Sequence, residues 1–200
     1  MIPDKISEAN PMTNKLNTPI LVVILLIAAL FSFANLGDRL LWQDEAEIAI
    51  VARNISQTKV PSAWDGRNIV SQQSGSEFGD DFVWRWSAWG THYLTYLGMK
   101  IFGETPFGFR SLFALFGVLT VLALYFAASS WTGNKHLALL ACALLLLSVP
   151  FFLHVRQCRY YPVIAFLGII AMGFYPKLQN THAKIVFIIS SAVMAYFNEL

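Results

Sequence analysis

Long apolar runs separated by short polar links dominate the pattern of this chain. A polar stretch containing three prolines, residues 1–19, precedes them and predicts a disordered tail. The runs predict membrane-spanning helices, because most approach the length that a helix needs to cross a bilayer. In chain order they cover residues 20–36, 106–131, 137–153 and 160–175, with an incomplete fifth span over residues 185–200.

Between the first and second spans lies a long mixed segment, residues 37–105. From Asp44 to about Thr58 the apolar residues recur at helical spacing on one stripe, which predicts a helix lying along the membrane surface. Residues 65–81 are rich in Gly, Ser, Gln and Asp and predict a mobile loop. Residues 82–102 are aromatic and apolar again, and predict a second interfacial helix leading back to the membrane.

Composition agrees with an all-α integral membrane protein. Hydrophobic residues make up 56% of the chain, charged residues 13%, and the mean hydropathy is +0.53. A soluble domain carries about twice that charged fraction. The net charge of +2 does not indicate a nucleic-acid partner. Cys142 and Cys158 form no metal-binding or redox spacing.

The lysines and arginines in the short connections predict the orientation in the membrane. With the N-terminus on the cytoplasmic side, the outer link between the third and fourth spans carries Arg156 and Arg159. Short loops and the absence of targeting signals favour a multi-pass protein of a bacterial inner membrane. The inner segments carry the lysines Lys5, Lys15, Lys135, Lys177 and Lys184.

Two adjacent carboxylates, Asp44 and Glu45, lie where the first span gives way to the outer segment. Asp44 could be a helix N-cap with Glu47 at the N3 position, a capping-box-like arrangement. Alternatively, one carboxylate near the membrane edge could act as a general base on an acceptor hydroxyl. Glu45 would then tune that base or bind the acceptor or a metal ion. Capping and catalysis do not exclude each other.

Other polar and aromatic clusters also have two interpretations each. Trp84, Trp86 and Trp89 fit an interfacial aromatic belt, or a stacking platform for a sugar or prenyl chain. Arg110 fits a snorkelling anchor at the start of the second span. His92 alone does not make a metal site. The acidic residues Glu77, Asp80 and Asp81 fit a solvated loop, or a site for a hard divalent cation.

The link between the third and fourth spans, residues 154–161, holds a histidine, two arginines and two tyrosines. On the outer face these side chains suit a phosphate group held at membrane depth. Ordinary anchoring at the membrane interface is the alternative.

Together these features resemble the GT-C membrane glycosyltransferases, in the branch of the protein O-mannosyltransferases and the lipid A aminoarabinose transferase. The similarity rests first on the Asp44–Glu45 pair, which follows a first span and opens an Ala-rich amphipathic helix. The later landmarks are Phe102-Gly103-Glu104 before the second span, Arg110 at its start, and residues 156–161.

The resemblance implies a GT-C-type bundle and inverting transfer of a sugar from a polyprenyl-phosphate donor. Asp44 would be the catalytic base, and Glu45 matches the second acidic residue of the pair. Arg156 and Arg159 would bind the donor phosphate. The lipid-linked donor and the membrane are the implied partners; the cofactor is left open, a divalent metal ion included. Further candidates for substrate binding are Arg53, Trp89, His92 and Tyr160.

The sequence departs from this family in two ways. Many members carry a Lys/His-Pro-Pro-Leu stretch in the second outer helix, where this chain has Ser87-Ala88-Trp89-Gly90. Members are also longer, so we expect this chain to be the N-terminal part of an enzyme. The alternatives are a non-enzymatic multi-span membrane protein, such as a transporter subunit, and an inactive truncated family member. The near absence of ionisable residues within the spans disfavours transport.

Overall fold

A computed structural model describes residues 11–197. Regular structure in this range is helical, apart from three isolated β-bridges in the loop that follows α2. The all-helical class predicted from the sequence is therefore confirmed. The helices are α1 (Pro11–Phe33), α2 (Gln43–Thr58), α3 (Trp89–Phe102), α4 (Pro106–Thr132), α5 (Lys135–Leu146), α6 (Val149–Val155), α7 (Tyr161–Phe174), a short 3-10 helix (Tyr175–Lys177) and α8 (Thr181–Phe197).

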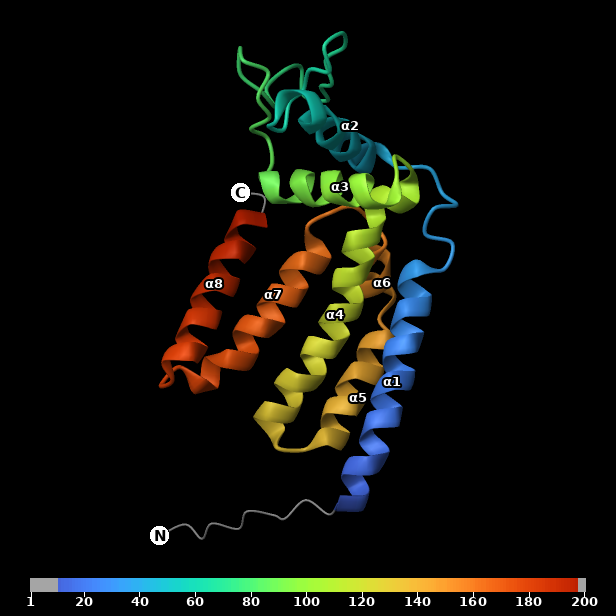
Figure 1. The fold of residues 1–200 in the computed structure, drawn as a ribbon, viewed down its shortest axis with the longest axis vertical. Helices are drawn as coiled ribbons and strands as arrows, with labels where there is room; N and C mark the ends of the chain where they lie inside the picture. The colour runs from blue at the N-terminus through green and yellow to red at the C-terminus, as the bar shows by residue number, and fades with distance from the viewer. Residues whose placement is uncertain (1–10, 198–200) are drawn as a thin grey trace.

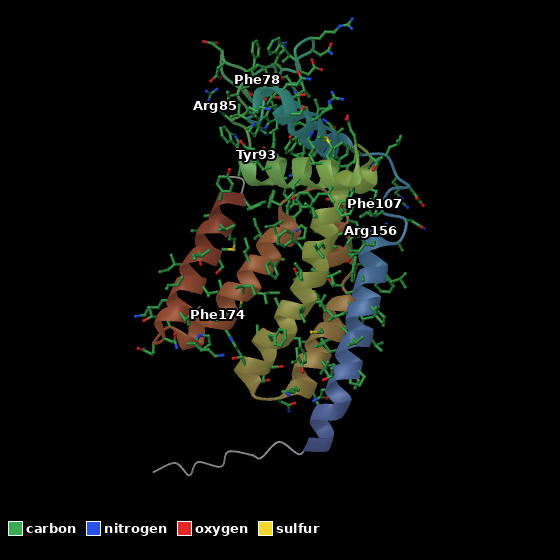
Figure 2. All side chains as sticks on the ribbon, in the orientation of Figure 1. Phe78, Arg85, Tyr93, Phe107, Arg156 and Phe174 are labelled. Atoms are coloured by element: carbon green, nitrogen blue, oxygen red, sulfur yellow. The ribbon has the colours of Figure 1, made fainter. Side chains whose placement is uncertain are left out.

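The helices form a bundle with a cap at one end. Helices α1, α5, α4, α7 and α8 run side by side, while α3 and α2 lie across one end of that bundle (Figure 1). Beyond α2 lies a loop layer, residues 59–88, where Figure 2 places Phe78 and Arg85; Phe174 lies toward the opposite end of the bundle. This cap contains the Asp44–Glu45 pair.

Helix α4 is the central member of the bundle and packs against α1, α3, α5 and α7. Its ends are set by local chemistry. The Thr105 side chain accepts a hydrogen bond from the Gly108 N–H at 3.1 Å, and Pro106 occupies the first turn. Gly133 ends the helix in the left-handed conformation, with φ of 65°.

Among the described helices, α4 alone is both long and apolar enough to cross a membrane. Helices α5 and α6 would pass the same test as one span, but they are bent by 71°. The apolar parts of α1, α7 and α8 are shorter. The number of membrane spans therefore stays a prediction.

Helix boundaries differ from the expected spans at two places in the bundle. Helix α1 already begins at Pro11, so the second half of the predicted tail is helical; residues 1–10 lie outside the described range. The expected third span, residues 137–153, is broken between α5 and α6. Ser148 caps α6 by accepting from Phe151 N–H at 3.4 Å, and Pro150 lies in its first turn, where a proline cannot continue the preceding helix.

The outer segment also differs from expectation. The apolar stripe of α2 is present, but Ile48, Val51, Ala52 and Ile55 are buried within the protein rather than on its surface. α3 and the loop layer around Trp84 cover the stripe. Residues 82–88 are irregular rather than helical, and Val83 and Trp84 form β-bridges to Ser62 and Phe78.

A single glycine lets α6 approach α4. A Cβ atom added to Gly117 would lie 2.3 Å from Cγ1 of the buried Val155. Valine has few alternative rotamers. We therefore expect Gly117→Ala to lower the free energy of unfolding by about 1–3 kcal/mol, the usual cost of overpacking. Denaturant unfolding followed by tryptophan fluorescence measures this change in the free energy of unfolding.

Gly168→Ala in α7 is the matched control. The added Cβ would meet only Met194 Sδ, at 3.7 Å, which is ordinary van der Waals contact. Because alanine favours helix over glycine by up to about 1 kcal/mol, this variant should be as stable as the parent or more so. Equal stabilities for the two variants would contradict the close α4–α6 packing.

Candidate functional site

Helix α2 begins two residues earlier than the capping interpretation of Asp44 requires. Trp42 is the N-cap, and Glu45, not Glu47, is at N3. The Glu45 carboxylate accepts a hydrogen bond from the Trp42 backbone N–H at 3.4 Å. Asp44 therefore lies within the first turn, where a negative charge interacts favourably with the helix dipole. The prediction that Asp44 is the N-cap is wrong.

Glu45 is fully buried and is held by charged and backbone donors. Arg110 donates to it twice, from Nε to Oε1 at 2.8 Å and from Nη2 to Oε2 at 2.5 Å. The Cys158 backbone N–H donates to Oε1 at 3.0 Å. One carboxylate thus joins α2, α4 and the link before α7. This geometry fits a role in positioning the first turn of α2; the predicted catalytic role of Glu45 stays a prediction.

Arg110 is buried, so its predicted role as an interfacial anchor is wrong. All five of its N–H donors are used. Besides Glu45, it donates from Nη1 to the carbonyls of Leu36 and Arg39, at 3.1 and 2.9 Å, and from Nη2 to the Leu40 carbonyl at 3.1 Å. Arg110 therefore fixes the connection between α1 and α2 against α4, as well as the start of α2.

Asp44 has a different environment from its neighbour. Its side chain is 37% exposed and forms an ion pair with Arg159 Nη1. The guanidinium of Arg159 lies 5.7–5.9 Å from the ring centroids of Trp42, Tyr160 and Tyr161, within the range of cation–π attraction. Arg159 is thus fixed between aromatic rings and in turn orients the Asp44 carboxylate.

Arg156 lies apart from this pair, at the end of α6. Its Nη1 donates to the carbonyls of Phe31 and Ser32 in the last turn of α1, at 2.8 and 3.4 Å. Figure 2 shows Arg156 at the capped end of the bundle, near the top of α1. Burial lowers the pKa of Arg156, and the neighbouring positive charges of Arg110 and Arg39 lower it further. Asp38 opposes this shift, and the two positive charges near Arg156 favour an anion beside it.

Two adjoining cavities meet at Arg156. The first is an apolar groove of about 440 Å³ between α1 and the α5–α6 break. The second is a polar pocket of about 580 Å³, whose walls include Asp38, Arg39 and Arg110. Ala34, Leu153 and Arg156 line both, so the groove and the pocket adjoin at Arg156.

A third pocket, of about 150 Å³, contains Asp44 and Arg159 in its wall. Glu45, in contrast, borders the polar pocket. The structure therefore separates the two predicted phosphate ligands: Arg156 lies at the groove, and Arg159 lies with the candidate base. It also separates the two carboxylates of the pair.

The remaining predicted substrate-binding residues lie away from these three cavities. Arg53 is exposed and pairs with Glu104 at 3.4 Å. Trp89 donates from Nε1 to the Trp84 carbonyl at 2.7 Å. The Tyr160 ring contacts that of Tyr161 in a tilted arrangement, with ring centroids 4.4 Å apart, beside Arg159. Their predicted roles in binding are not tested by this arrangement.

His92 is fully buried in α3, with its ring 6.1 Å from that of Trp84. Within residues 11–197 neither imidazole nitrogen has a hydrogen-bond partner. Burial lowers the pKa of His92 to about 3, so the ring is neutral at physiological pH. It lines none of the three cavities, and its predicted role in substrate binding is likewise untested.

The acidic residues of the loop layer do not converge. Glu77 is buried and accepts from the backbone N–H groups of Gln72 and Gln73, both at 2.5 Å. Although burial opposes it, these hydrogen bonds lower the pKa of Glu77. Asp81 pairs with Arg85 at 2.7 Å. Across the described residues no group of three His, Cys, Asp or Glu side chains could hold a metal ion, so the cation site suggested at Glu77, Asp80 and Asp81 is wrong.

Two features of the site were not found in the sequence. Arg39 lies three residues after the first apolar run, a position that suits a phosphate ligand at a membrane edge, yet a lone arginine there has no distinctive spacing. Gln72 and Gln73 share a pocket wall with Asp44 in a loop that Glu77 and Gln43 hold, which no local pattern indicates.

Comparisons with known proteins identify no family for this chain. No family model and no solved structure matches the chain. A protein of Aquifex aeolicus (strain VF5), described as uncharacterized, is 34% identical over 105 residues, which make up 52% of this chain and 21% of that relative. The match thus spans about a fifth of the relative's length.

Proposed function

We propose that this chain forms part of a GT-C-type membrane glycosyltransferase, which moves a sugar from a polyprenyl-phosphate donor to a hydroxyl acceptor. The observation that carries the proposal is the apolar groove that adjoins, at Arg156, a polar pocket containing further arginines. A lipid with a long apolar chain and an anionic head group fits this arrangement, because the chain suits the apolar groove and the head group suits the polar pocket.

In this proposal the prenyl chain lies along the groove between α1 and the α5–α6 break, whose exposed side chains include Leu30, Leu147 and Leu153. The donor phosphate lies beside Arg156 and Arg39. When the bond between the sugar and the phosphate breaks, negative charge grows on the departing phosphate. Fixed guanidinium groups stabilise that charge and so lower the barrier.

Asp44 is the proposed base. Its partial exposure leaves the carboxylate accessible to an acceptor, and its pairing with Arg159 fixes its direction. The carboxylate accepts the proton of the acceptor hydroxyl as the hydroxyl oxygen attacks the anomeric carbon, and polyprenyl phosphate departs from the opposite side. Glu45 and Arg110 hold the turn that carries Asp44.

The setting in this proposal is a bacterial inner membrane crossed several times by the chain, with its N-terminus on the cytoplasmic side. The site then faces outward. A long, apolar α4 supports the membrane setting, as do the exposed apolar side chains of α8, including Ile185, Ile188 and Ile189.

The Arg156 junction gives a direct test. We expect Arg156→Ala to weaken binding of decaprenyl phosphate at least tenfold, because a charge-assisted hydrogen bond contributes about 1.5–3 kcal/mol. Arg67→Ala is the matched control, since Arg67 is exposed in the loop layer and lines none of the three cavities. Titration of the purified protein in nanodiscs, followed by tryptophan fluorescence, measures the affinity.

Decaprenol, which lacks the phosphate, should bind the parent more weakly than decaprenyl phosphate does. Its affinity should be the same for the parent and for Arg156→Ala. If Arg156→Ala binds decaprenyl phosphate as well as the parent does, Arg156 is no phosphate ligand. A protein that binds neither lipid would favour the non-enzymatic alternative.

A further inference from the structure

The third pocket is not used by the donor in the function proposed above. It lies between the first turns of α2, the loop layer and the link before α7. Its volume of about 150 Å³ is the smallest of the three cavities, so it suits a small ligand such as one polar ring. Its walls are formed by Asp44, Glu47, Ile48, Gln72, Gln73, Trp86, Ser87 and Arg159.

The neutral polar groups of this pocket suit ligand hydroxyls. Carboxamides and hydroxyls both donate and accept hydrogen bonds, as sugar hydroxyls do. Gln72 is oriented by its Oε1 atom, which accepts from Gln43 Nε2 at 2.8 Å. Ser87 Oγ accepts from Trp84 Nε1 at 3.0 Å, so the Ser87 hydroxyl proton is directed elsewhere. These groups are therefore pre-oriented by protein contacts.

Trp86 adds an aromatic face. Trp86 belongs to the pocket wall although the residue is 54% exposed, and its backbone N–H donates to the Glu77 carbonyl at 3.1 Å. The face of an indole ring carries partial negative charge, and attracts the polarised C–H groups on one side of a sugar ring. A large aromatic residue held at the rim of a polar pocket favours a ring ligand over an extended peptide.

The charges of the pocket favour a neutral ligand. The three charged residues of its wall, Asp44, Glu47 and Arg159, carry a formal charge of −1 together, and Asp44 forms an ion pair with Arg159. An anionic ligand would therefore be repelled from this pocket, whereas the Arg156 pocket attracts it.

We propose that this third pocket binds one neutral sugar unit of the acceptor, with a hydroxyl directed at Asp44. The acceptor of transfer is then a saccharide rather than a protein side chain or a phosphate. The role as acceptor rests on the proposed function, whereas the binding of a sugar at this place does not.

Saturation-transfer NMR on the purified protein, at the length in which it occurs, tests the binding. The probes are methyl α-mannoside, methyl β-glucoside, methyl β-galactoside and the peptide acetyl-Ala-Ser-Ala-amide. The protein is kept in nanodiscs or a zwitterionic detergent, because alkyl-glycoside detergents would occupy the same pocket. We expect at least one glycoside to give saturable transfer, and the peptide to give none.

Substitutions locate the binding. Trp86→Ala should weaken it at least tenfold, whereas Trp64→Ala, at another exposed tryptophan of the same loop layer, should not. Gln73→Ala should weaken it as well, with Gln57→Ala at the exposed end of α2 as its control. Thermal unfolding of each variant shows that it is folded.

Arg156→Ala separates the two proposals, because this variant should no longer bind decaprenyl phosphate but should still bind the glycoside. Glycoside binding without prenyl-phosphate binding would remove the proposed function and leave the sugar pocket in place. The proposed sugar pocket is overturned if no glycoside gives saturable transfer, or if the peptide competes with the glycoside. It is also overturned if Trp86→Ala and Trp64→Ala change the affinity for the glycoside equally.

Discussion

Replacing Arg110 with alanine should destabilise the protein more than any other change at the capped end of the bundle. The substitution leaves the fully buried Glu45 carboxylate without its cation and removes the donors to three backbone carbonyls. Breaking a buried ion pair by removing one partner costs about 3–5 kcal/mol. We expect a loss of this size in the free energy of unfolding, or failure to accumulate folded protein.

Arg53→Ala provides the comparison for Arg110→Ala. Arg53 also pairs with a carboxylate, Glu104, but both side chains are exposed, at 44% and 53%. Exposed ion pairs contribute about 0–1 kcal/mol, so this variant should unfold near the parent midpoint. Denaturant titration in the purification detergent, followed by tryptophan fluorescence, ranks the variants. Similar losses in the free energy of unfolding for Arg110→Ala and Arg53→Ala would show that Arg110 does not hold a buried Glu45.

Replacing Asp44 with asparagine should lower the rate of sugar transfer by about 10²–10⁴-fold, the usual contribution of a general base. Asparagine preserves the size of the side chain but cannot accept the proton. Because the Asp44 side chain is 37% exposed, the folded state should survive the change, in contrast to Arg110→Ala. The readout is release of polyprenyl phosphate from mannosyl- and glucosyl-phosphoryl polyprenols by the protein at its natural length.

Asp80→Asn is the matched control for Asp44→Asn, because Asp80 is an exposed carboxylate of the loop layer outside the three cavities. It should transfer sugar at the parent rate. Undiminished transfer by Asp44→Asn would remove Asp44 as the base. Glu45→Gln is expected to lose transfer together with stability, because Glu45 holds the turn through Arg110 and Cys158.

Much of the fold follows from local patterns that the sequence carries directly. The apolar runs predict helices because each residue adds the same rise and turn, and the stripe of Ile48, Val51, Ala52 and Ile55 places the inner face of α2. The sequence predicted that a membrane covers this stripe, whereas α3 and the loop layer cover it, since a membrane and apolar side chains offer the same apolar surface. The bend before α6 was signalled by Pro150, but an otherwise continuous apolar run obscured it.

The sequence by itself determined an all-helical chain with two carboxylates at the start of α2 and two arginines before α7. Only the tertiary structure assigned them different partners: Glu45 is buried against Arg110, and Asp44 is half-exposed beside Arg159. It likewise placed Arg156 at the groove and Arg159 among aromatic rings. Neighbours in a helix point about 100° apart, so adjacent residues meet different elements, and which elements those are depends on contacts between segments far apart in the chain.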